Sequence, residues 1–279
     1  MHVALDPDDV RELTRAWQGD RLSDGRPRVP DAVLARLRTV TTEQAWGVLR
    51  DAGYHLQFSG EWMETHPGTV IVGRALTSSF LPHRPDLDAA VVAAGARDGH
   101  HEADKQNSWV ISMLQRGDVM VTDIFGKVAE GTVIGDNLGT AVAVRTGVGA
   151  VIDGGVRDLA GLQELEGVNV FCRGTHPTAI ADVVLAGVNL PVRIGEATVL
   201  PGDVVLGTPS GVIFIPAHLA ERVADAAEEV SVRDEYGKGR IADGSFTSAE
   251  IDVEPWAEHI EAAFATWRSG RAGVAGVAR

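Results

Sequence analysis

Residues 131–158, GTVIGDNLGTAVAVRTGVGAVIDGGVRD, carry the pattern that decides the fold. Within this stretch, GAVIDGG at 149–155 is an apolar strand that ends in two glycines, and the polar pair Arg157 and Asp158 follows it. Before the strand, a glycine-bounded turn at 135–140 leads into AVAVRTG, which has the character of a short helix. A helix that precedes a buried strand in this way predicts an α/β domain, in which ligands bind where the strands end.

Further strands and helices are expected on both sides of this stretch. Short segments rich in β-branched residues predict strands at 69–76, 118–125, 168–174, 182–194, 197–200, 203–208 and 211–216. Capping residues and a 3.6-residue period predict helices within 7–53 and at 86–98, 108–115, 217–231 and 248–268.

Three regions are expected along the chain. An N-terminal helical arm is predicted over residues 1–66, and a single α/β domain with closing C-terminal helices over 67–269. The glycine-rich end at 270–279 is predicted to be a flexible tail. No internal repeat or low-complexity linker divides the chain further.

Composition and charge exclude several classes of function. The 279 residues include 25 Lys and Arg against 39 Asp and Glu, a net charge of −14 that repels nucleic-acid backbones. The single cysteine, Cys172, allows neither an internal disulfide nor a cysteine-based zinc site. The acidic start MHVALDPDD lacks the features of a signal peptide, and no apolar run is long enough to span a membrane. We therefore expect a cytoplasmic protein without nucleic-acid or membrane partners.

Common catalytic motifs are absent from the sequence. It contains no G-x-x-x-x-G-K-[ST] phosphate loop, and Ile152 stands where a dinucleotide-binding pattern needs its third glycine. Ser210 lies in TPSGV, which is not the G-x-S-x-G turn of a serine hydrolase. Because these motifs are missing, the sequence excludes both nucleotide-dependent and serine-hydrolase chemistry.

The turn at 135–140 and the Arg157–Asp158 pair remain as candidate binding elements. A turn that opens a helix directs free backbone N–H groups and a partial positive charge toward a small carboxylate or phosphate. Arg157 offers a bidentate clamp for an anionic group, and Asp158 offers a hard oxygen ligand for a divalent cation. Asp136, if the fold brings it close, can position a water for proton transfer. Each element taken alone is also common in purely structural turns.

The spacing of these residues resembles a family signature. Asp136, followed by 20 residues and then Arg157-Asp158, resembles the D-x20-R-D pattern of the 4-hydroxy-4-methyl-2-oxoglutarate aldolase and RraA-like (regulator of ribonuclease E activity) family. The likeness continues through RGDVMVTDIFGK at 116–127, VFCRGTHP at 170–177 and LPGDVVLGTPSGVIFIP at 200–216. It implies a layered α/β fold of swivelling-domain type, with a central β-structure flanked by helices. It also implies a ring-like homotrimer, or a hexamer built of two trimers, with the active site near a subunit interface.

The resemblance further implies a chemistry and a role for each residue. Family aldolases are metal-dependent and cleave a 2-oxo acid to release pyruvate, with oxaloacetate decarboxylation as a related activity. By this resemblance, Asp158 would bind Mg²⁺ or Mn²⁺, and Arg157 would hold the pyruvoyl group and stabilise the enolate oxygen. The backbone amides of Asn137 and Leu138, in the turn that starts at Gly135, would bind the substrate carboxylate. Asp136 would hold the water that acts as general acid or base.

The lysines favour a metal over an imine. Cleavage of a C–C bond beside a 2-oxo group leaves an enolate, which needs either a cation at its oxygen or an imine with lysine. The sequence has only Lys105, Lys127 and Lys238, and none lies at the centre of a predicted strand, where a buried imine lysine is expected. One departure from the family pattern concerns acid–base assistance, because Leu159-Ala160-Gly161 stand where family aldolases commonly carry an acidic residue.

Several alternatives stay open at this point. The protein could instead be a non-catalytic, protein-binding regulator like the family's namesakes, or a dehydratase or hydrolase acting on a sugar-derived oxo acid. The cluster His100, His101, Glu102 and Asp104 is either a solvated loop or a substrate lid or second metal site. His176 in RGTHP either lines the pocket of Arg157 or only shapes a turn.

Overall fold

The computed structural model describes residues 2–101 and 104–275. The chain divides into two compact units, Met1–Ala224 and Asp225–Arg279, and each is described by itself. The predicted arm and the predicted sheet fall within the same first unit.

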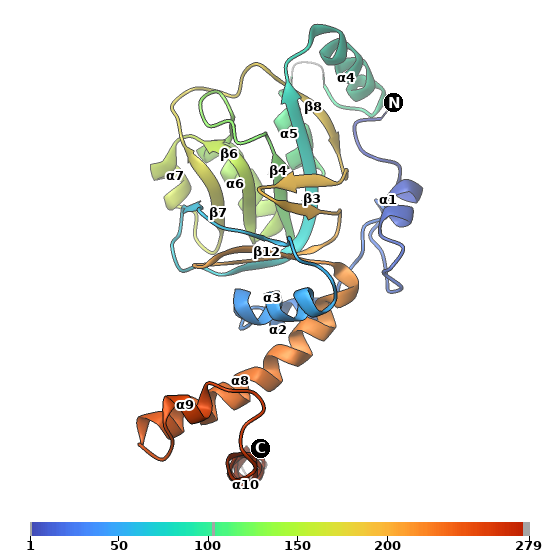
Figure 1. Cartoon of the computed structure of the whole chain (residues 1–279). Coiled ribbons are helices and arrows are strands. Elements are labelled where there is room, and N and C mark those ends of the chain that lie inside the picture. Colours follow the sequence, from blue (N-terminus) through green and yellow to red (C-terminus); the bar gives the residue numbers. More distant parts are fainter. Residues whose placement is uncertain (1, 102–103, 276–279) are drawn as a thin grey trace. The chain divides into compact units, whose positions relative to one another are not determined.

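The first unit is built on a parallel core of strands (Figure 1). Parallel pairing joins β3 to β4, β4 to β6, and β6 to both β5 and β7. These strands are β3 (Ile71–Pro82), β4 (Asp118–Asp123), β5 (Thr132–Ile134), β6 (Gly149–Val156) and β7 (Asn169–Thr175). The predicted strand at 149–155 is therefore central, and the three strands that pair with it, β4, β5 and β7, all run in its own direction.

Antiparallel strands extend the sheet beyond β3. β11 pairs with the first part of β3, β8 pairs with its second part, and β12 pairs with β11. These strands are β8 (Val183–Val188), β11 (Val204–Thr208) and β12 (Gly211–Ile215). The short strand β1 (Phe58–Ser59) pairs with β12, and β2 (Met63–Glu64) pairs with β7 at the opposite edge of the sheet. β9 (Val192–Ile194) and β10 (Ala197–Val199) form a separate hairpin. The prediction of one strand over 182–194 is wrong, since Asn189 takes a left-handed φ of 59° and ends β8.

Apolar residues alternate between two cores along the parallel strands. Leu76, Met120 and Ile152 pack in a core with α5 and α6, whereas their neighbours Ala75, Val119 and Val151 pack with the β9–β10 hairpin. α5 (Gln106–Ser112) and α6 (Asp136–Thr146) are joined in the first of these cores by α4 (Pro85–Arg97). Side chains that point alternately to opposite faces are the ordinary consequence of a pleated strand, so both faces of the central strands are buried.

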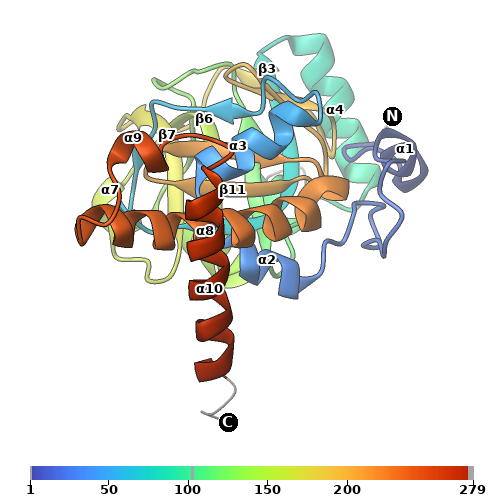
Figure 2. The same cartoon turned by 60° about the horizontal axis from the view of Figure 1, so that its bottom comes forward.

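The N-terminal arm forms three short helices with irregular chain between them. These are α1 (Pro7–Leu13), α2 (Asp31–Leu37) and α3 (Thr42–Asp51). Asp6 caps α1, and Thr41 and Gln44 form a capping box at the start of α3, as the capping residues predict. In Figure 2, α3 lies over β11, and α3 also contacts β12. The predicted helical region 7–53 is thus helical only in part.

The C-terminal helices differ from the prediction: the helix expected over 217–231 extends to Ala242, and the single helix expected over 248–268 is divided in two. They are α8 (Ala220–Ala242), α9 (Ser248–Ile251) and α10 (Glu258–Ala275), and a short 3₁₀ turn, Ala217–Leu219, precedes them. Tyr236, Trp256, Ile260 and Phe264 form a small aromatic core within the second unit. α10 extends into the segment for which a flexible tail is predicted, and residues 276–279 lie outside the described residues.

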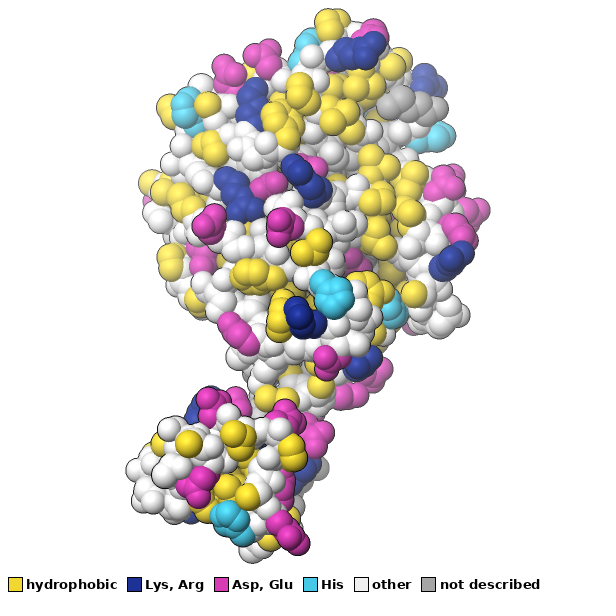
Figure 3. All heavy atoms as spheres, viewed as in Figure 1, with side chains coloured by type: hydrophobic (Ala, Val, Ile, Leu, Met, Phe, Trp, Pro, Cys, Tyr) yellow, Lys and Arg dark blue, Asp and Glu magenta, His cyan; other side chains and the backbone are white. Residues whose placement is uncertain are grey.

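The acidic side chains on the surface are spread out rather than gathered in one patch. On the face shown in Figure 3, Asp and Glu side chains are distributed over the molecule. Within the described residues, none of the helices has both the length and the apolar character needed to cross a bilayer.

A buried ion pair fixes the arm to the sheet. Arg26 lies in the irregular segment between α1 and α2, is 0% exposed, and donates from both terminal nitrogens to Asp118 at 3.0 and 2.9 Å. Asp118 is the first residue of β4, and its carboxylate also accepts from the backbone of Gln115 at 2.9 Å. Burial raises the pKa of the Asp118 carboxyl, and the guanidinium of Arg26 opposes that rise. The stability of the folded state therefore depends on both partners, because either charge would be costly to bury alone.

Removing one partner should cost more stability than removing both. Arg26→Met leaves the Asp118 carboxylate buried without its cation, so we expect a loss of about 3–5 kcal/mol in the free energy of unfolding at neutral pH. The folded-state pKa of Asp118 rises further in this variant, so stability falls as pH increases and the loss is larger at pH 8 than at pH 5. The Arg26→Met/Asp118→Asn double variant should recover part of the loss. Urea unfolding at both pH values measures this, and equal losses at both would contradict the account.

Candidate functional site

Strand pairing brings the two candidate elements together. β5 and β6 pair in parallel, with Thr132 opposite Gly155 and Ile134 opposite Val156. One residue further, the backbone N–H of Arg157 donates to the carbonyl of Ile134 at 3.0 Å. Because parallel neighbours end at the same edge of a sheet, the turn that follows β5 lies directly beside the pair that follows β6.

Gly135 makes the closest approach between these elements. It ends β5 and caps α6, and a Cβ atom placed on it would lie 2.4 Å from Asp158 Oδ2 and 3.0 Å from Arg157 Nε. Real Cβ contacts are not that short, so any side chain here would displace the Arg157–Asp158 pair. The backbone of the turn therefore rests directly against the two charged groups.

The Arg157–Asp158 pair is accessible and its backbone is unusual. Arg157 Nε lies 3.3 Å from Asp158 Oδ2, and the two side chains are 41% and 43% exposed. Asp158 takes a left-handed φ of 53° as it caps the short helix α7 (Leu159–Gln163). Non-glycine residues adopt this conformation infrequently, and such positions cluster at functional sites. Because the side chains of Arg157 and Asp158 are both partly exposed, both charges can reach a ligand without a rearrangement of the core.

Asp136 occupies the first position of α6, beside α7. Its Oδ1 accepts from the backbone N–H of Asn137 at 2.7 Å, so this amide already has a partner that a substrate carboxylate would have to replace. A Cβ atom on Gly161 would lie 2.7 Å from Asp136 Cβ. An acidic side chain at position 161 would collide with Asp136, which explains the small residue that stands there.

A cavity of about 200 Å³ opens at this edge of the sheet. Five of the predicted site residues line it: Gly135, Asp136, Asn137, Leu138 and Arg157. Asp158 is not among the lining residues, although its carboxylate contacts Arg157. The fold thus gathers the predicted binding groups around one small cavity, with the predicted metal ligand beside it.

α5 supplies lining residues that the sequence analysis missed. Lys105, Asn107 and Ser108 line the same cavity, at the start of α5. Asn107 is only 4% exposed, and its Nδ2 donates to the carbonyl of Val133 at 2.6 Å. Its buried Oδ1 has no hydrogen-bond partner among the residues that the structure describes. In the sequence, only the polar run DKQN at 104–107 points to these lining residues, and the same run is equally typical of a solvated loop.

The histidine candidates lie outside this cavity. His176 follows β7, where its backbone N–H donates to the carbonyl of Val156 at 3.0 Å and its Nδ1 lies 2.9 Å from Thr178 Oγ1. The ring of His100 stacks on Trp109 with a centroid distance of 5.0 Å. His101 is exposed and does not line the cavity, and Glu102 lies outside the described residues. These contacts give His176 and His100 structural partners.

The donor set suits one kind of metal. Within residues 2–101 and 104–275, no group of three or more His, Cys, Asp or Glu side chains could enclose an ion. Mg²⁺ and Mn²⁺ prefer oxygen ligands, and Mg²⁺ keeps several waters and is held by one or two carboxylates together with its substrate. The exposed carboxylate of Asp158 fits that mode of binding, whereas a zinc site with several protein ligands does not.

Known proteins resemble this chain in sequence and in fold. The chain is 32% identical over 128 residues to a protein of Halalkalibacterium halodurans named "Putative 4-hydroxy-4-methyl-2-oxoglutarate aldolase". The match covers 46% of this chain and 60% of that relative, so the chain spans less than two thirds of its length.

Solved structures share the fold. The structure of Streptomyces coelicolor RraAS2, described as an unusual member of the RNase ES inhibitor RraA protein family, matches with a TM-score of 0.62 at 24% identity, over 76% of this chain and 98% of that one. An uncharacterized protein from Pseudomonas syringae matches with a TM-score of 0.65 at 24% identity, over 81% and 100%. The predicted layered α/β fold is confirmed. With a family model for RraA-like proteins (Aldolase/RraA) matching residues 26–214, the chain belongs to the RraA-like family.

Proposed function

We propose that the protein is a divalent-metal-dependent lyase that cleaves a 2-oxo acid to release pyruvate. The reaction is aldol cleavage of a substrate of the 4-hydroxy-4-methyl-2-oxoglutarate type, decarboxylation of oxaloacetate, or both. The observation that supports the proposal is the close approach of Gly135 to Arg157 and Asp158, because a turn that would bind an anion then lies beside a cation and a carboxylate. The name of the Halalkalibacterium halodurans relative supports the same reaction class.

Arg157 and Asp158 have separate roles in this proposal. Asp158 would hold Mg²⁺ or Mn²⁺, which supplies a Lewis acid for the 2-oxo group when bound. Arg157 lines the cavity and presents a planar guanidinium, which can bind the oxygens of the 2-oxo acid in a bidentate manner. As charge develops on the enolate oxygen, this guanidinium stabilises it. The backbone amides of Asn137 and Leu138 would orient the substrate carboxylate at the start of α6, where the substrate replaces Asp136 Oδ1 as the partner of the Asn137 amide.

Asp136 is positioned to move a proton. Its side chain is exposed and lines the same cavity as Arg157, and binding of the substrate carboxylate to the Asn137 amide would release Asp136 Oδ1 to hold a water. Through one water, this carboxylate can take the proton of the C4 hydroxyl during aldol cleavage. Through the same water, a proton can return to the carbon of the enolate to give pyruvate. Decarboxylation releases CO₂ and removes no proton, so its enolate would take a proton from solvent through the same water. One acid–base group from this chain would therefore serve both reactions.

Lys105 gives the cavity a second cation. Both 4-hydroxy-4-methyl-2-oxoglutarate and oxaloacetate carry two carboxylates, and Arg157 with Lys105 matches that pair of charges. Lys105 is exposed at the start of α5, unlike the buried lysine that imine formation requires. We assign it to the far carboxylate of the substrate. The active assembly in this proposal is a cytoplasmic homotrimer or hexamer.

Loss of Asp158 tests the proposed metal ligand. Wild-type protein should release pyruvate from oxaloacetate or from 4-hydroxy-4-methyl-2-oxoglutarate, lose this activity in EDTA, and regain it with Mg²⁺ or Mn²⁺. Asp158→Ala should lower the metal-dependent rate by roughly 100-fold or more, because the cation that stabilises the enolate is no longer held. A coupled assay for pyruvate measures both.

Glu166→Ala is the matched control for Asp158→Ala, because it removes an exposed carboxylate from the loop that follows α7. It should keep the wild-type rate. Unchanged activity in Asp158→Ala would refute the metal assignment. A folded wild-type protein that releases no pyruvate with either metal would favour the protein-binding regulator or a different reaction at this site.

Gly135→Ala tests the close approach. The new methyl group would push Asp158 and Arg157 out of position, so we expect a loss of roughly 100-fold in kcat/KM with the fold retained. Gly47→Ala is the matched control, since a Cβ on this helical glycine meets nothing within 4 Å. Circular dichroism verifies the fold of both variants. Full activity in Gly135→Ala would show that the contact has no catalytic role.

A further inference from the structure

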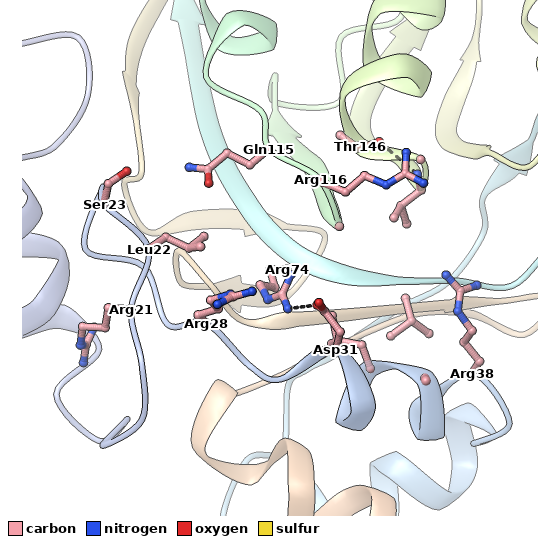
Figure 4. A pocket seen from close by; sticks show the side chains of 16 residues that line it. Arg21, Leu22, Ser23, Arg28, Asp31, Arg38, Arg74, Gln115, Arg116 and Thr146 are labelled. Carbon is pink, nitrogen blue, oxygen red and sulfur yellow. Dashed lines mark hydrogen bonds and ion pairs between the residues drawn. The ribbon is translucent and has the colours of Figure 1, made fainter.

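A second cavity, of about 740 Å³, is lined by arginines. Arg28, Arg38, Arg74 and Arg116 come from the N-terminal arm, the end of α2, β3 and the turn before β4, and Figure 4 shows them around one opening. Arg21 also lines the cavity, but its guanidinium is bound to the carbonyls of residues 14, 17 and 25. We call the first four the arginine pocket.

The backbone is shaped to hold two of these guanidinium groups. Gly117 has a φ of 81°, and a Cβ atom on it would lie 2.9 Å from Arg74 Nη1. Gly147 has a φ of 66°, and a Cβ atom there would lie 2.7 Å from Arg116 Nη1. Any other residue at these positions would be strained and would press on an arginine. Two separate turns therefore leave space for charged groups that face one cavity.

The arginines of this pocket outnumber the carboxylates that line the cavity, so the cavity has an excess of positive charge. Arg74 is 3% exposed, and it donates to the carbonyl of Val29 and to Asp31, as the dashed line in Figure 4 marks. Asp31 is the single carboxylate of the lining, and the hydrogen bond from Arg74 lowers its pKa, with a further contribution from Arg28. Arg38 and Arg116 have no ion-pair partner in the described part of the chain. Four arginines face one aspartate in a protein whose net charge is −14.

The arginine pocket is separate from the candidate active site. Gly117 and Val148 immediately precede β4 and β6, whereas Arg157 and Asp158 follow β6. The two sites thus lie at opposite ends of the same parallel strand. At about 3.3 Å per residue, the length of β6 separates them by roughly 23 Å.

We propose that the arginine pocket binds a small polyanion, an organic molecule with at least two phosphate or carboxylate groups. Guanidinium groups match both kinds of anion in bidentate geometry, and several of them in one concave site focus the field on a compact ligand. Leu22, Leu34 and Val72 in the lining can cover an apolar body. The volume is that of a small-molecule site, and the acidic surface outside it opposes an extended nucleic-acid backbone. This proposal does not depend on the reaction at Arg157 and Asp158.

Calorimetric titration of the full chain tests this proposal. Inorganic pyrophosphate and citrate serve as probes, at low ionic strength and in EDTA, so that no divalent cation can bind the probe at Asp158. At least one probe should bind with one site per chain, and the stronger of the two distinguishes a phosphate from a carboxylate ligand. Arg38→Gln/Arg116→Gln should weaken binding by at least about tenfold, since each arginine provides charge-assisted bonds.

Two control variants separate the arginine pocket from other cationic sites. Arg50→Gln removes an exposed arginine of α3 outside the pocket, and Asp158→Ala alters the candidate active site; both should bind the probe as wild type does. The single variants Arg38→Gln and Arg116→Gln, checked by thermal unfolding, reproduce the effect if the double variant does not fold. No binding of either probe at millimolar concentration, equal loss in Arg50→Gln, or tighter binding of single-stranded RNA than of pyrophosphate would overturn the proposal.

Discussion

The parallel pairing of β5 with β6 is the constraint on which the candidate site depends. It fixes Ile134 opposite Val156 and thereby places Gly135 against the Arg157–Asp158 pair. A shift of this register by one residue would turn the buried strand residues to the wrong face and would separate the turn from the two charges. The same hydrogen-bonded ladder that buries the apolar residues of β6 thus sets the geometry of the charged groups at its end.

The sequence predicts the main features of this site because they are local. The apolar run of β6, the turn at 135–140 and the Arg157–Asp158 pair are all visible in one stretch of 28 residues. The side-chain-to-backbone contacts that complete the site are not local. Gly161 is small because Asp136 lies against it, and Asn107 reaches the cavity from a segment that precedes β4. Such contacts between distant segments cannot be derived from spacing or composition.

The fold shows the same division between local and distant determinants. Asp6 and Thr41 cap their helices as their types predict, and the apolar residues of the central strands are buried as expected. The break at Asn189 and the burial of Arg26 against Asp118 depend on tertiary contacts instead. Arg26 also lies in the segment that supplies Arg28 to the arginine pocket, so one buried ion pair anchors the arm whose charges line the opposite end of the sheet.

The central claim is that Arg157, Asp158 and a divalent cation stabilise the enolate of pyruvate, and it can be tested without knowledge of the full substrate. Pyruvate in D₂O exchanges its methyl protons only if the enolate forms, and nuclear magnetic resonance follows this exchange directly. The account predicts rapid exchange with wild-type protein and Mg²⁺ or Mn²⁺, and none above background in EDTA. Absence of exchange with folded protein and either metal, or exchange that persists in EDTA, would contradict it.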